Sequence, residues 1–408
     1  MQWNWQQNNW PEFNYNASAL EELESVFYAE SLKLIGATSI ITKEQEQRFT
    51  IDLMSEEALK SSKIEGELLN RDSVASSLLR QLGLAPELSD HRANDKEKGI
   101  AALMVNNYQT YDQPLTHQMM FDWHPCVVAK SLLVRDVGKY RTSKEPMQVV
   151  SGYEGNHTVH FQAPSAAQVP EAMDSYVKWF NDTAPGGSNP LPPLTRAGIA
   201  HIYFVSIHPF DDGNGRVGRA LSEKALAQSL ERPALIALSH VIEETRSEYY
   251  KQLEQNNKGL DIDPWLSYFS NTAFDAVGHS QKLVKFVVEK TRLFDRVRDQ
   301  INERQEKVLL RMFAEGADGF KGGLSAKNYM QITGAELRQN VTRDLQKLIE
   351  LGALTKTGQL KGTRYWLNLG KELDGEKTKH LASQKKSRME ILATKKKKRK
   401  QNELGQER

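Results

Sequence analysis

The sequence predicts a mainly α-helical protein that carries a small β-hairpin in its middle and ends in an α+β winged helix-turn-helix unit. Three observations lead to this prediction. Apolar residues recur at helical spacing through most of residues 1–292. Residues 147–161 contain two β-rich runs around a Gly-Asn turn, which is typical of a hairpin. Residues 303–369 read as three helices followed by a second hairpin, the order of a winged helix.

Composition is that of an ordinary globular protein. The 408 residues allow for two or three domains, and 39% hydrophobic and 26% charged residues are typical values. No apolar run reaches about 18 residues, and the N-terminus lacks a basic stretch followed by an apolar one, so we expect a cytoplasmic protein without a membrane segment. The single cysteine, Cys126, excludes a disulfide within the chain and is expected to be a small buried side chain.

An N-terminal helical region is predicted for residues 1–95. Ser18 and Glu21 have the spacing of a capping box before the first helix. A second helix is expected at about residues 43–62 and a third at 72–82. Five aromatic residues precede these helices: Trp3, Trp5, Trp10, Phe13 and Tyr15. We expect them to pack against the helices, with a ligand platform as the alternative.

Residues 96–292 are expected to form a second helical domain with the hairpin inside it. His157 and His160 on that hairpin are three residues apart, so they point to opposite faces of a strand and do not form a metal pair. Residues 182–193 are rich in Gly and Pro and are predicted to be a loop. The next segment has helical spacing until Pro209 ends it.

The most informative stretch is HPFDDGNGRVGR, residues 208–219. Gly213, Gly215 and Gly218 match a dinucleotide-binding fingerprint, but a helix precedes them and no series of parallel strands follows, so that interpretation is rejected. The stretch instead predicts a helix, a sharp loop and a second helix that starts near Gly215. Backbone N–H groups at the start of that helix would form an anion site suited to phosphate.

The side chains of this stretch predict nucleotidyl or phosphoryl transfer. Arg216 and Arg219 are three residues apart on one helix face, and guanidinium groups bind phosphate oxygens bidentately. Asp211 or Asp212 offers the carboxylate oxygen that Mg²⁺ prefers. His208 lies just across the loop, where it can take the proton of an attacking hydroxyl.

Residues 208–219 resemble the signature of the Fic family, and every signature position matches. The resemblance covers about residues 55–275 and implies a Fic-type helical core that transfers AMP from ATP to Ser, Thr or Tyr hydroxyls of proteins. It assigns His208 as the base and Phe210 as a buried anchor. It further implies that Asp212 binds Mg²⁺ or Mn²⁺. The remaining signature residues would hold the phosphates of ATP: Gly213, Asn214, Gly215, Arg216 and Arg219.

The same resemblance implies the binding surfaces around the loop. The hairpin at 147–161 is similar to the family's flap, on which a target segment docks as an added strand. The segment 249–257 is similar to the adenine-side helix, which implies Tyr250 and Asn257 as base contacts; packing of Tyr250 in the core is the alternative. The sequence leaves the formation of a homodimer open.

A second motif is expected to act on the first. Ser61, Glu65 and Gly66 in SSKIEGELL resemble the N-terminal inhibitory motif of one Fic class. A carboxylate at Glu65 can pair bidentately with Arg219 and so compete with the γ-phosphate of ATP. We therefore expect an autoinhibited adenylyltransferase. The reverse reaction, removal of AMP, and the transfer of another phosphate-containing group remain alternatives.

The C-terminal part allows a further alternative, a DNA-binding regulator. In the predicted winged helix of residues 303–369, the third helix offers Arg338, Gln339 and Arg343 to a DNA groove or to a protein partner. The tail, residues 371–408, carries thirteen Lys/Arg against six Asp/Glu, a net +7 that leaves −5 on the rest of the chain. This tail is expected to be disordered, or to attract nucleic acid.

Overall fold

The chain divides into two compact units, Met1–Val284 and Lys285–Arg408. The computed structural model describes residues 2–39, 41–85, 93–129, 134–153, 156–233, 236–315, 320 and 322–369. The predicted fold class is confirmed: a mainly helical protein with two small hairpins. No helix in these described ranges is long and apolar enough to cross a membrane.

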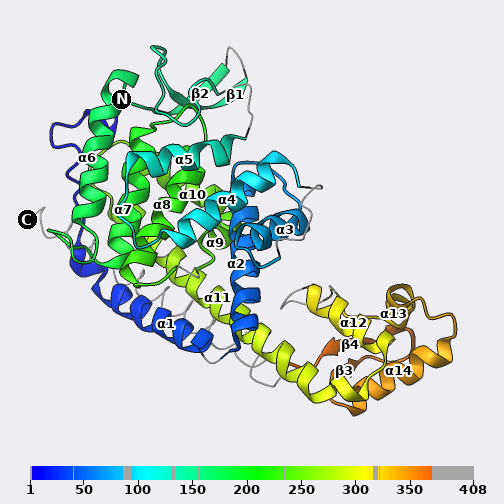
Figure 1. The fold of residues 1–408 in the computed structure, drawn as a ribbon. Helices are drawn as coiled ribbons and strands as arrows, with labels where there is room; N and C mark the ends of the chain where they lie inside the picture. Colours follow the sequence, from blue (N-terminus) through cyan, green and yellow to red (C-terminus); the bar gives the residue numbers. More distant parts are fainter. Residues whose placement is uncertain are drawn as a thin grey trace, which may run out of the picture. The chain divides into compact units, whose positions relative to one another are not determined.

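Unit 1 consists of helices with one inserted hairpin (Figure 1). Its helices are α1 (Glu21–Ser39), α2 (Lys43–Ile64), α3 (Arg71–Gln81), α4 (Asp95–Gln109), α5 (His117–Val128), α6 (Val169–Asp182), α7 (Pro193–Ile207), α8 (Asn214–Ser229), α9 (Leu238–Glu244), α10 (Arg246–Asn256) and the first part of α11 (Asp263–Val297). The predicted second and third helices are confirmed as α2 and α3. Thr42 and Gln45 start α2 with a capping box, in which each side chain accepts from the other residue's backbone N–H.

Helices α7 and α8 pack against each other at the centre of unit 1, joined by residues 208–213 (Figure 1). Side chains are buried on every face of α7, as expected for a helix that is surrounded by protein. The buried Arg196 on α7 donates to the carbonyl oxygens of Ala225 and Phe180 at 3.0 and 2.9 Å. These bonds satisfy a charge that would otherwise be costly to bury.

A glutamate from α1 caps the N-terminus of α7. Pro192 precedes α7 and offers no capping side chain. Glu24 takes that role, because its carboxylate accepts from the backbone N–H groups of Leu194 and Thr195 at 2.9 and 2.8 Å. A carboxylate at this position satisfies the free N–H groups and interacts favourably with the helix dipole. The contact fixes the N-terminal region on the core.

The aromatic residues at the N-terminus pack on the core and the hairpin. Trp3 is buried and lies edge-on to Phe161, with ring centroids 5.5 Å apart. Trp10 contacts Tyr203 of α7 in the same way at 5.3 Å. Burial of Trp3 is therefore confirmed, but its partner is the hairpin and not the N-terminal helices. The expected cap at Ser18 is wrong: Ser18 lies inside a 3-10 turn (Ala17–Ala19), and α1 begins three residues later.

The predicted hairpin is present as β1 (Gln148–Tyr153) and β2 (Asn156–Gln162). The strands are antiparallel, with Gln148 opposite Gln162 and an irregularity between Val149 and Val150. Carbonyl groups on the outer edge of β2 accept hydrogen bonds from Asn257 and Trp5. Among the described residues, no such side-chain contact covers the outer edge of β1.

Unit 2 has the order of elements predicted for a winged helix. It contains α12 (Glu303–Ala314), α13 (Ala326–Thr333), α14 (Arg338–Glu350), β3 (Leu354–Thr357) and β4 (Arg364–Leu367). The two strands are antiparallel, and Leu324 adds a short bridge to Tyr365. An apolar core that includes Val308, Leu345 and Leu354 holds the helices against the hairpin.

Candidate active site

The HPFDDGNGRVGR stretch forms the sharp loop between α7 and α8, residues 208–213, and the first turns of α8. His208 ends α7 in the left-handed conformation, with φ of 52°. Gly213 precedes α8 with φ of 82°. A Cβ atom on Gly213 would lie 2.7 Å from Val127 Cγ2, so both the conformation and the space require glycine there. The predicted helix, loop and helix are confirmed, with α8 starting at Asn214.

The His208 ring has one nitrogen engaged and the other free to accept a proton. Its Nδ1 lies 3.3 Å from the carbonyl oxygen of Val205. Because a carbonyl can only accept, Nδ1 carries the hydrogen and Nε2 of the neutral ring has the lone pair. Burial, helped by the nearby Arg141 guanidinium, lowers the pKa of His208 to about 4. The imidazole is therefore neutral at pH 7, the form that a general base requires.

Phe210 and His124 support the loop from below. Phe210 is fully buried and stacks on the His124 ring, with centroids 4.1 Å apart. His124 Nδ1 accepts from the N–H of Gly138 at 3.1 Å, so its Nε2–H donates to the carbonyl oxygen of Asp212, also at 3.1 Å. The predicted anchoring role of Phe210 agrees with this packing. The role of His124 was not anticipated, since nothing in its local sequence marks it.

Arg141 binds the backbone at the start of the loop and in the segment after β2. Its Nε–H donates to the carbonyl oxygen of His208 at 2.8 Å, and its Nη2 donates to that of Pro164 at 2.6 Å. The side chain is 3% exposed. Arg141 thus links the backbone of His208 to the segment after β2. Sequence analysis missed it because an isolated arginine in a loop has no pattern.

The two aspartates of the loop have different surroundings. Asp211 Oδ2 accepts from the backbone N–H groups of Arg135 and Asp136, both at 3.2 Å. It thus connects the loop to the segment after α5. Asp212 has a side chain that is 61% exposed, with Oδ2 3.7 Å from Arg216. Its Oδ1 accepts from the N–H of Gly213 at 2.6 Å. Of the two, Asp212 is the carboxylate that a cation in the site can reach.

The Asn214 side chain closes the loop and does not face the site. Its Oδ1 accepts from the N–H of Phe210 at 3.0 Å, and its Nδ2 donates to the carbonyl of the same residue at 2.8 Å. Asn214 can therefore bind a phosphate only through its backbone N–H group. The next residue, Gly215, lies in the first turn of α8, where backbone N–H groups have no partner within the helix.

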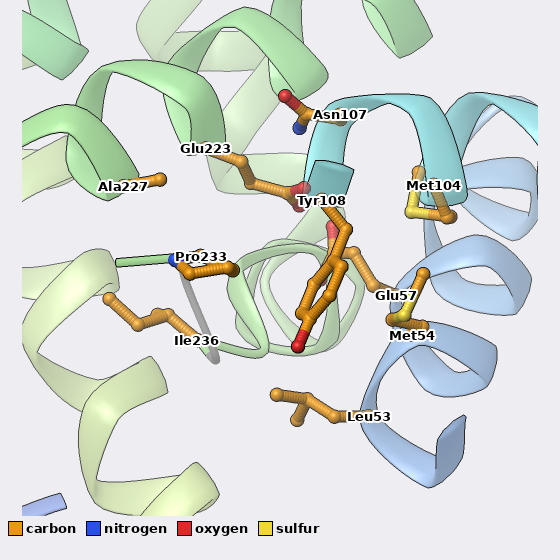
Figure 2. A pocket seen from close by; sticks show the side chains of 10 residues that line it. All are labelled: Leu53, Met54, Glu57, Met104, Asn107, Tyr108, Glu223, Ala227, Pro233 and Ile236. Atoms are coloured by element: carbon orange, nitrogen blue, oxygen red, sulfur yellow. The ribbon is translucent and has the colours of Figure 1, made fainter. Parts of the chain in front are cut away.

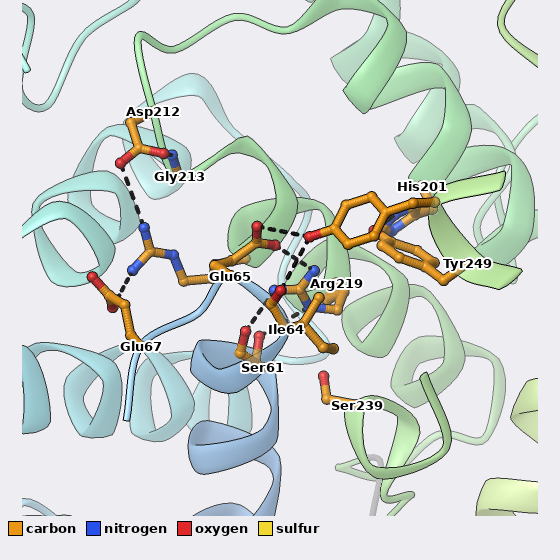
Figure 3. Close-up of polar contacts among 12 residues, drawn as sticks. Ser61, Ile64, Glu65, Glu67, His201, Asp212, Gly213, Arg219, Ser239 and Tyr249 are labelled. Atoms are coloured by element: carbon orange, nitrogen blue, oxygen red, sulfur yellow. Dashed lines mark hydrogen bonds and ion pairs between the residues drawn. The ribbon is translucent and has the colours of Figure 1, made fainter. Parts of the chain in front are cut away.

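Both arginines of the stretch are buried and paired with carboxylates from the segment after α2 (Figure 3). Arg216 Nη1 lies 2.8 Å from Glu67 Oε2, and Lys96 holds the other Glu67 oxygen at 2.6 Å. The buried Arg216 Nε has no hydrogen-bond partner among the described residues. The sequence did not point to Glu67, because it belongs to no recognisable motif and is marked only by its closeness to Glu65.

Arg219 is fully buried, and its guanidinium binds the predicted inhibitory motif (Figure 3). Its Nε donates to Ser61 Oγ at 3.0 Å, Nη2 donates to the Ser61 carbonyl at 2.8 Å, and Nη1 donates to Glu65 Oε1 at 2.9 Å. Burial alone would lower the pKa of Arg219, but the Glu65 carboxylate raises it above the ordinary value. The expected contact between Glu65 and Arg219 is present, but it is a single hydrogen bond and not a bidentate pair.

The Glu65 carboxylate also lies directly over the start of α8. A Cβ atom on Gly215 would be 2.4 Å from Glu65 Oε1, so the carboxylate rests where only glycine leaves room. The other oxygen, Oε2, accepts from the Tyr250 hydroxyl at 3.2 Å. Gly66 follows Glu65 directly and has the left-handed conformation, with φ of 85°. A negative group thus occupies the helix N-terminus at which the sequence predicts a phosphate.

The two predicted adenine contacts lie on different sides of α10. Tyr250 is 39% exposed and faces the inhibitory segment, since its one hydroxyl hydrogen is shared between Glu65 Oε2 and the carbonyl of Ile64, 3.1 Å away. Asn257 is buried and donates to the carbonyl of His160 on β2 at 3.2 Å. Its Oδ1 has no partner among the described residues.

A small cavity lies between α2, α4 and α8 (Figure 2). Its volume is about 40 Å³, and its lining includes the carboxyl groups of Glu57 and Glu223. Burial raises the pKa of both groups, and Glu57 raises that of Glu223 further. A cavity of this size holds about one water molecule, whereas small-molecule sites have volumes of roughly 300–1,000 Å³. It is therefore not a nucleotide site.

The residues proposed for nucleic-acid contact lie in unit 2, on α14. Arg338, Gln339 and Arg343 are all exposed. The basic tail, residues 371–408, lies outside the described residues.

Family comparisons agree with this geometry. Residues 114–226 match the model of the Fic/DOC family, and residues 3–84 match a domain of unknown function, DUF4172. The chain therefore contains a Fic/DOC family domain. That domain includes the loop at 208–219 and both of its arginines, whereas Glu65 belongs to the preceding domain.

Curated relatives match only a part of the chain. The protein adenylyltransferase fic-1 of Caenorhabditis elegans is 36% identical over 108 residues, 26% of this chain and 20% of that protein. The protein adenylyltransferase Fic of Drosophila grimshawi is 33% identical over 119 residues, 29% of this chain and 22% of that protein. The chain thus matches about a fifth of the length of these relatives.

A solved structure supports the fold. The crystal structure of a Fic family protein from Desulfovibrio desulfuricans covers 88% of this chain and 98% of its own, with a TM-score of 0.50 and 20% identity. At this identity the likeness extends to the fold and not to the activity.

Proposed function

We propose that the protein transfers AMP from ATP to a Ser, Thr or Tyr hydroxyl of a target protein or of itself. The observation that carries the proposal is the His208 ring, whose Nε2 is free to accept a proton beside a helix N-terminus with two arginines. The names of the curated relatives, protein adenylyltransferases, support the same reaction.

ATP fits the chemistry of the loop. Phosphate oxygens would take the backbone N–H groups at the start of α8 and the guanidinium groups of Arg216 and Arg219. Mg²⁺ or Mn²⁺ fits as well, because Mg²⁺ is commonly held by one carboxylate together with substrate phosphates, and Asp212 offers one exposed carboxylate. When bound, the cation would offset the charge of the phosphate chain.

His208 would act as the general base. Nε2 accepts the proton of the attacking hydroxyl while the hydroxyl oxygen forms a bond to the α-phosphorus. The bond from that phosphorus to the bridging oxygen breaks, and pyrophosphate leaves. The products are the AMP ester of the target and pyrophosphate. Val205 keeps the ring in the tautomer that this transfer requires, and Arg141 holds the backbone of His208.

The target segment is proposed to dock on β1. The outer edge of β2 is covered by Asn257 and Trp5, which leaves β1 as the strand for an added segment to pair with. Val149 and Val150 on that strand are 40% and 50% exposed. They offer an apolar surface for the side chains of the added strand.

Glu65 is proposed to inhibit the reaction. Its carboxylate takes both the Arg219 guanidinium and the space over Gly215, two places that a phosphate of ATP would need. ATP would then bind without its α-phosphate in line with the nucleophile. A bias of about 2.7 kcal/mol is enough to hold 99% of the molecules in this state. Glu67 on Arg216 would add to the same effect.

The direct test uses ATP labelled in its α-phosphate with purified Glu65→Gly protein, followed by mass spectrometry of the modified sites. The added mass of AMP on a hydroxyl would support the proposal, and another mass would indicate transfer of a different group. Removal of AMP from a modified target by the wild-type protein would instead support the reverse reaction. Loss of the label in a Glu65→Gly/His208→Ala protein would assign the reaction to this site.

DNA binding through unit 2 is a second candidate, favoured by the exposed Arg338, Gln339 and Arg343 on α14. It is tested with the full chain by measuring how affinity for duplex DNA falls with salt, and comparing an Arg338→Ala/Arg343→Ala variant. Each lost phosphate contact would reduce the slope of log K against log salt by about one. Identical slopes for the wild type and the double variant would count against DNA binding through α14.

A further inference from the structure

A cluster of two histidines and a glutamate lies outside the candidate active site, where three helices of unit 1 meet. Glu56 comes from α2, His240 from α9 and His279 from α11. Glu56 Oε1 lies 2.6 Å from His240 Nδ1 and 3.3 Å from His279 Nε2. One ligand atom from each residue lies within 4.8 Å of the other two. The reaction proposed above makes no use of these groups.

The two ring nitrogens that face Glu56 lack well-aligned hydrogen bonds. Within the described part of the chain, His240 Nδ1 and His279 Nε2 are buried without such a partner, even though a carboxylate oxygen is close to each. The two rings stack with centroids 3.7 Å apart. Buried polar atoms normally have partners, so two ring nitrogens that converge on one carboxylate oxygen without aligned bonds indicate a missing group among them.

We propose that Glu56, His240 and His279 bind a divalent transition-metal ion, with Zn²⁺ as the expected one. Two imidazole nitrogens and a carboxylate are a donor set that zinc accepts, and a fourth position is left for water or another ligand. Ligand atoms on one zinc ion lie roughly 3–4 Å apart, as follows from bonds of about 2.0–2.2 Å in a tetrahedral site. The observed spacing therefore requires only small adjustments of the side chains.

The surroundings of His240 fit this role. Glu244 Oε1 lies 3.5 Å from His240 Nε2, the nitrogen that faces away from Glu56. A carboxylate on the outer nitrogen orients the ring and favours the tautomer whose Nδ1 is free for a metal. The side chains of Glu56, His240 and His279 are 13%, 16% and 23% exposed, which leaves a path for an ion to enter.

A metal at this place would join α2 to α9 and α11. The same stretch of α2 already contacts α9 through Glu57, whose carboxylate accepts from the N–H of Ser239 at 2.8 and 3.0 Å. α9 has seven residues, and such a short helix depends on contacts with its neighbours. The ion would thus strengthen the attachment of α2 to the core, independently of the reaction that the core performs.

The test is metal binding by the purified full-length protein. The protein is stripped with a chelator, and Zn²⁺ is then titrated in competition with a chromophoric chelator, with bound metal counted by elemental analysis. We expect about one tightly held Zn²⁺ per chain in the wild type and at least a tenfold weaker site in His240→Gln and in His279→Gln. Co²⁺ in place of Zn²⁺ should give visible absorption bands that both variants lose.

Two matched controls separate this site from others. His117→Gln removes a histidine that binds Tyr140 at 2.6 Å and lies outside the cluster, and it should leave Zn²⁺ binding unchanged. Asp212→Asn removes the carboxylate proposed for Mg²⁺ and should leave it unchanged as well. Circular dichroism confirms that each variant is folded, and Glu56→Gln serves if a histidine variant is not. Equal Zn²⁺ affinity in the wild type and the folded cluster variants, or no tight binding in the wild type, would overturn the proposal.

Discussion

Replacing Glu65 with glycine is the perturbation that most directly tests the proposed autoinhibition. The change removes the hydrogen bond from Arg219 Nη1 and the one from the Tyr250 hydroxyl, and it clears the space over Gly215. Both bonds from Arg219 to Ser61 remain, so the arginine stays in position. Glu65 lies at the end of α2 and Gly66 already has the turn conformation there, so glycine at 65 should leave the fold intact.

The magnitude follows from the two lost contacts. A hydrogen bond between charged groups contributes about 1.5–3 kcal/mol, and one from a neutral hydroxyl about 0.5–1.5 kcal/mol. The Glu65 side chain is 28% exposed, so screening by solvent favours the lower half of that sum, about 2–3 kcal/mol. At 1.4 kcal/mol per factor of ten, we expect AMP incorporation to rise about 30- to 150-fold.

The assay is incorporation of label from α-labelled ATP into the protein itself and into lysate proteins, at equal protein concentrations. Glu44→Gly, on the exposed first turn of the same helix, is the matched control and should remain at the wild-type rate. Glu65→Gln keeps an acceptor for Arg219 but loses the charge, so its rate should be intermediate. Equal incorporation by wild type and Glu65→Gly would refute the inhibitory role.

Three further predictions concern the base and the core. His208→Ala in the activated protein should lower the rate by about 10²–10⁴-fold, and an unchanged rate would rule out its role as the base. Because the pKa of His208 is lowered to about 4 and only the neutral ring accepts a proton, kcat/KM of the activated protein should stay level as pH falls from 7 to about 5; an acid limb near 6.5 would contradict this. Gly99→Ala would bring a Cβ within 2.3 Å of the Cys126 carbonyl oxygen and should lower the free energy of unfolding by about 1–3 kcal/mol, measured by urea denaturation. Gly278→Ala, with nothing within 4 Å, is its helical control and should not destabilise.

The catalytic loop was predictable because its signals are local. Pro209 ends one helix, glycine at 213 allows the left-handed turn into the next, and Arg216 and Arg219 share a face by helical spacing. These features depend on residues that are at most a few positions apart. The same holds for the hairpin at 148–162 and for the order of elements in unit 2.

The contacts that hold the loop in place were not predictable, because they join distant parts of the chain. Arg141 reaches the backbone of a residue 67 positions later, and Glu67 reaches Arg216 across 149 positions. Single charged residues in loops produce no periodicity. Glu65 was found only through its resemblance to a known motif, and that resemblance did not reveal that Ser61 supplies two of the three bonds to Arg219.

Three glutamates of the N-terminal region lie at the N-termini of three core helices. Glu24 accepts from backbone N–H groups of α7, Glu57 accepts from one on α9, and Glu65 lies over the first turn of α8. The first two are buried and bind backbone that no substrate needs. Glu65 is instead held by the side chains of Arg219 and Tyr250. The first two contacts therefore fix the region on the core, and of the three glutamates only Glu65 lies where we propose that a phosphate of ATP binds.

This division of roles predicts that loss of Glu24 weakens the fold without the activation caused by loss of Glu65. Glu24→Ala leaves two buried N–H groups at the start of α7 without a partner, at a cost of about 1–3 kcal/mol each. The midpoint of urea unfolding should fall, while AMP incorporation under native conditions stays near the wild-type rate. If Glu24→Ala instead labels as strongly as Glu65→Gly while still folded, the whole N-terminal region and not Glu65 alone restrains the site, because release would then follow from loosening any of its attachments.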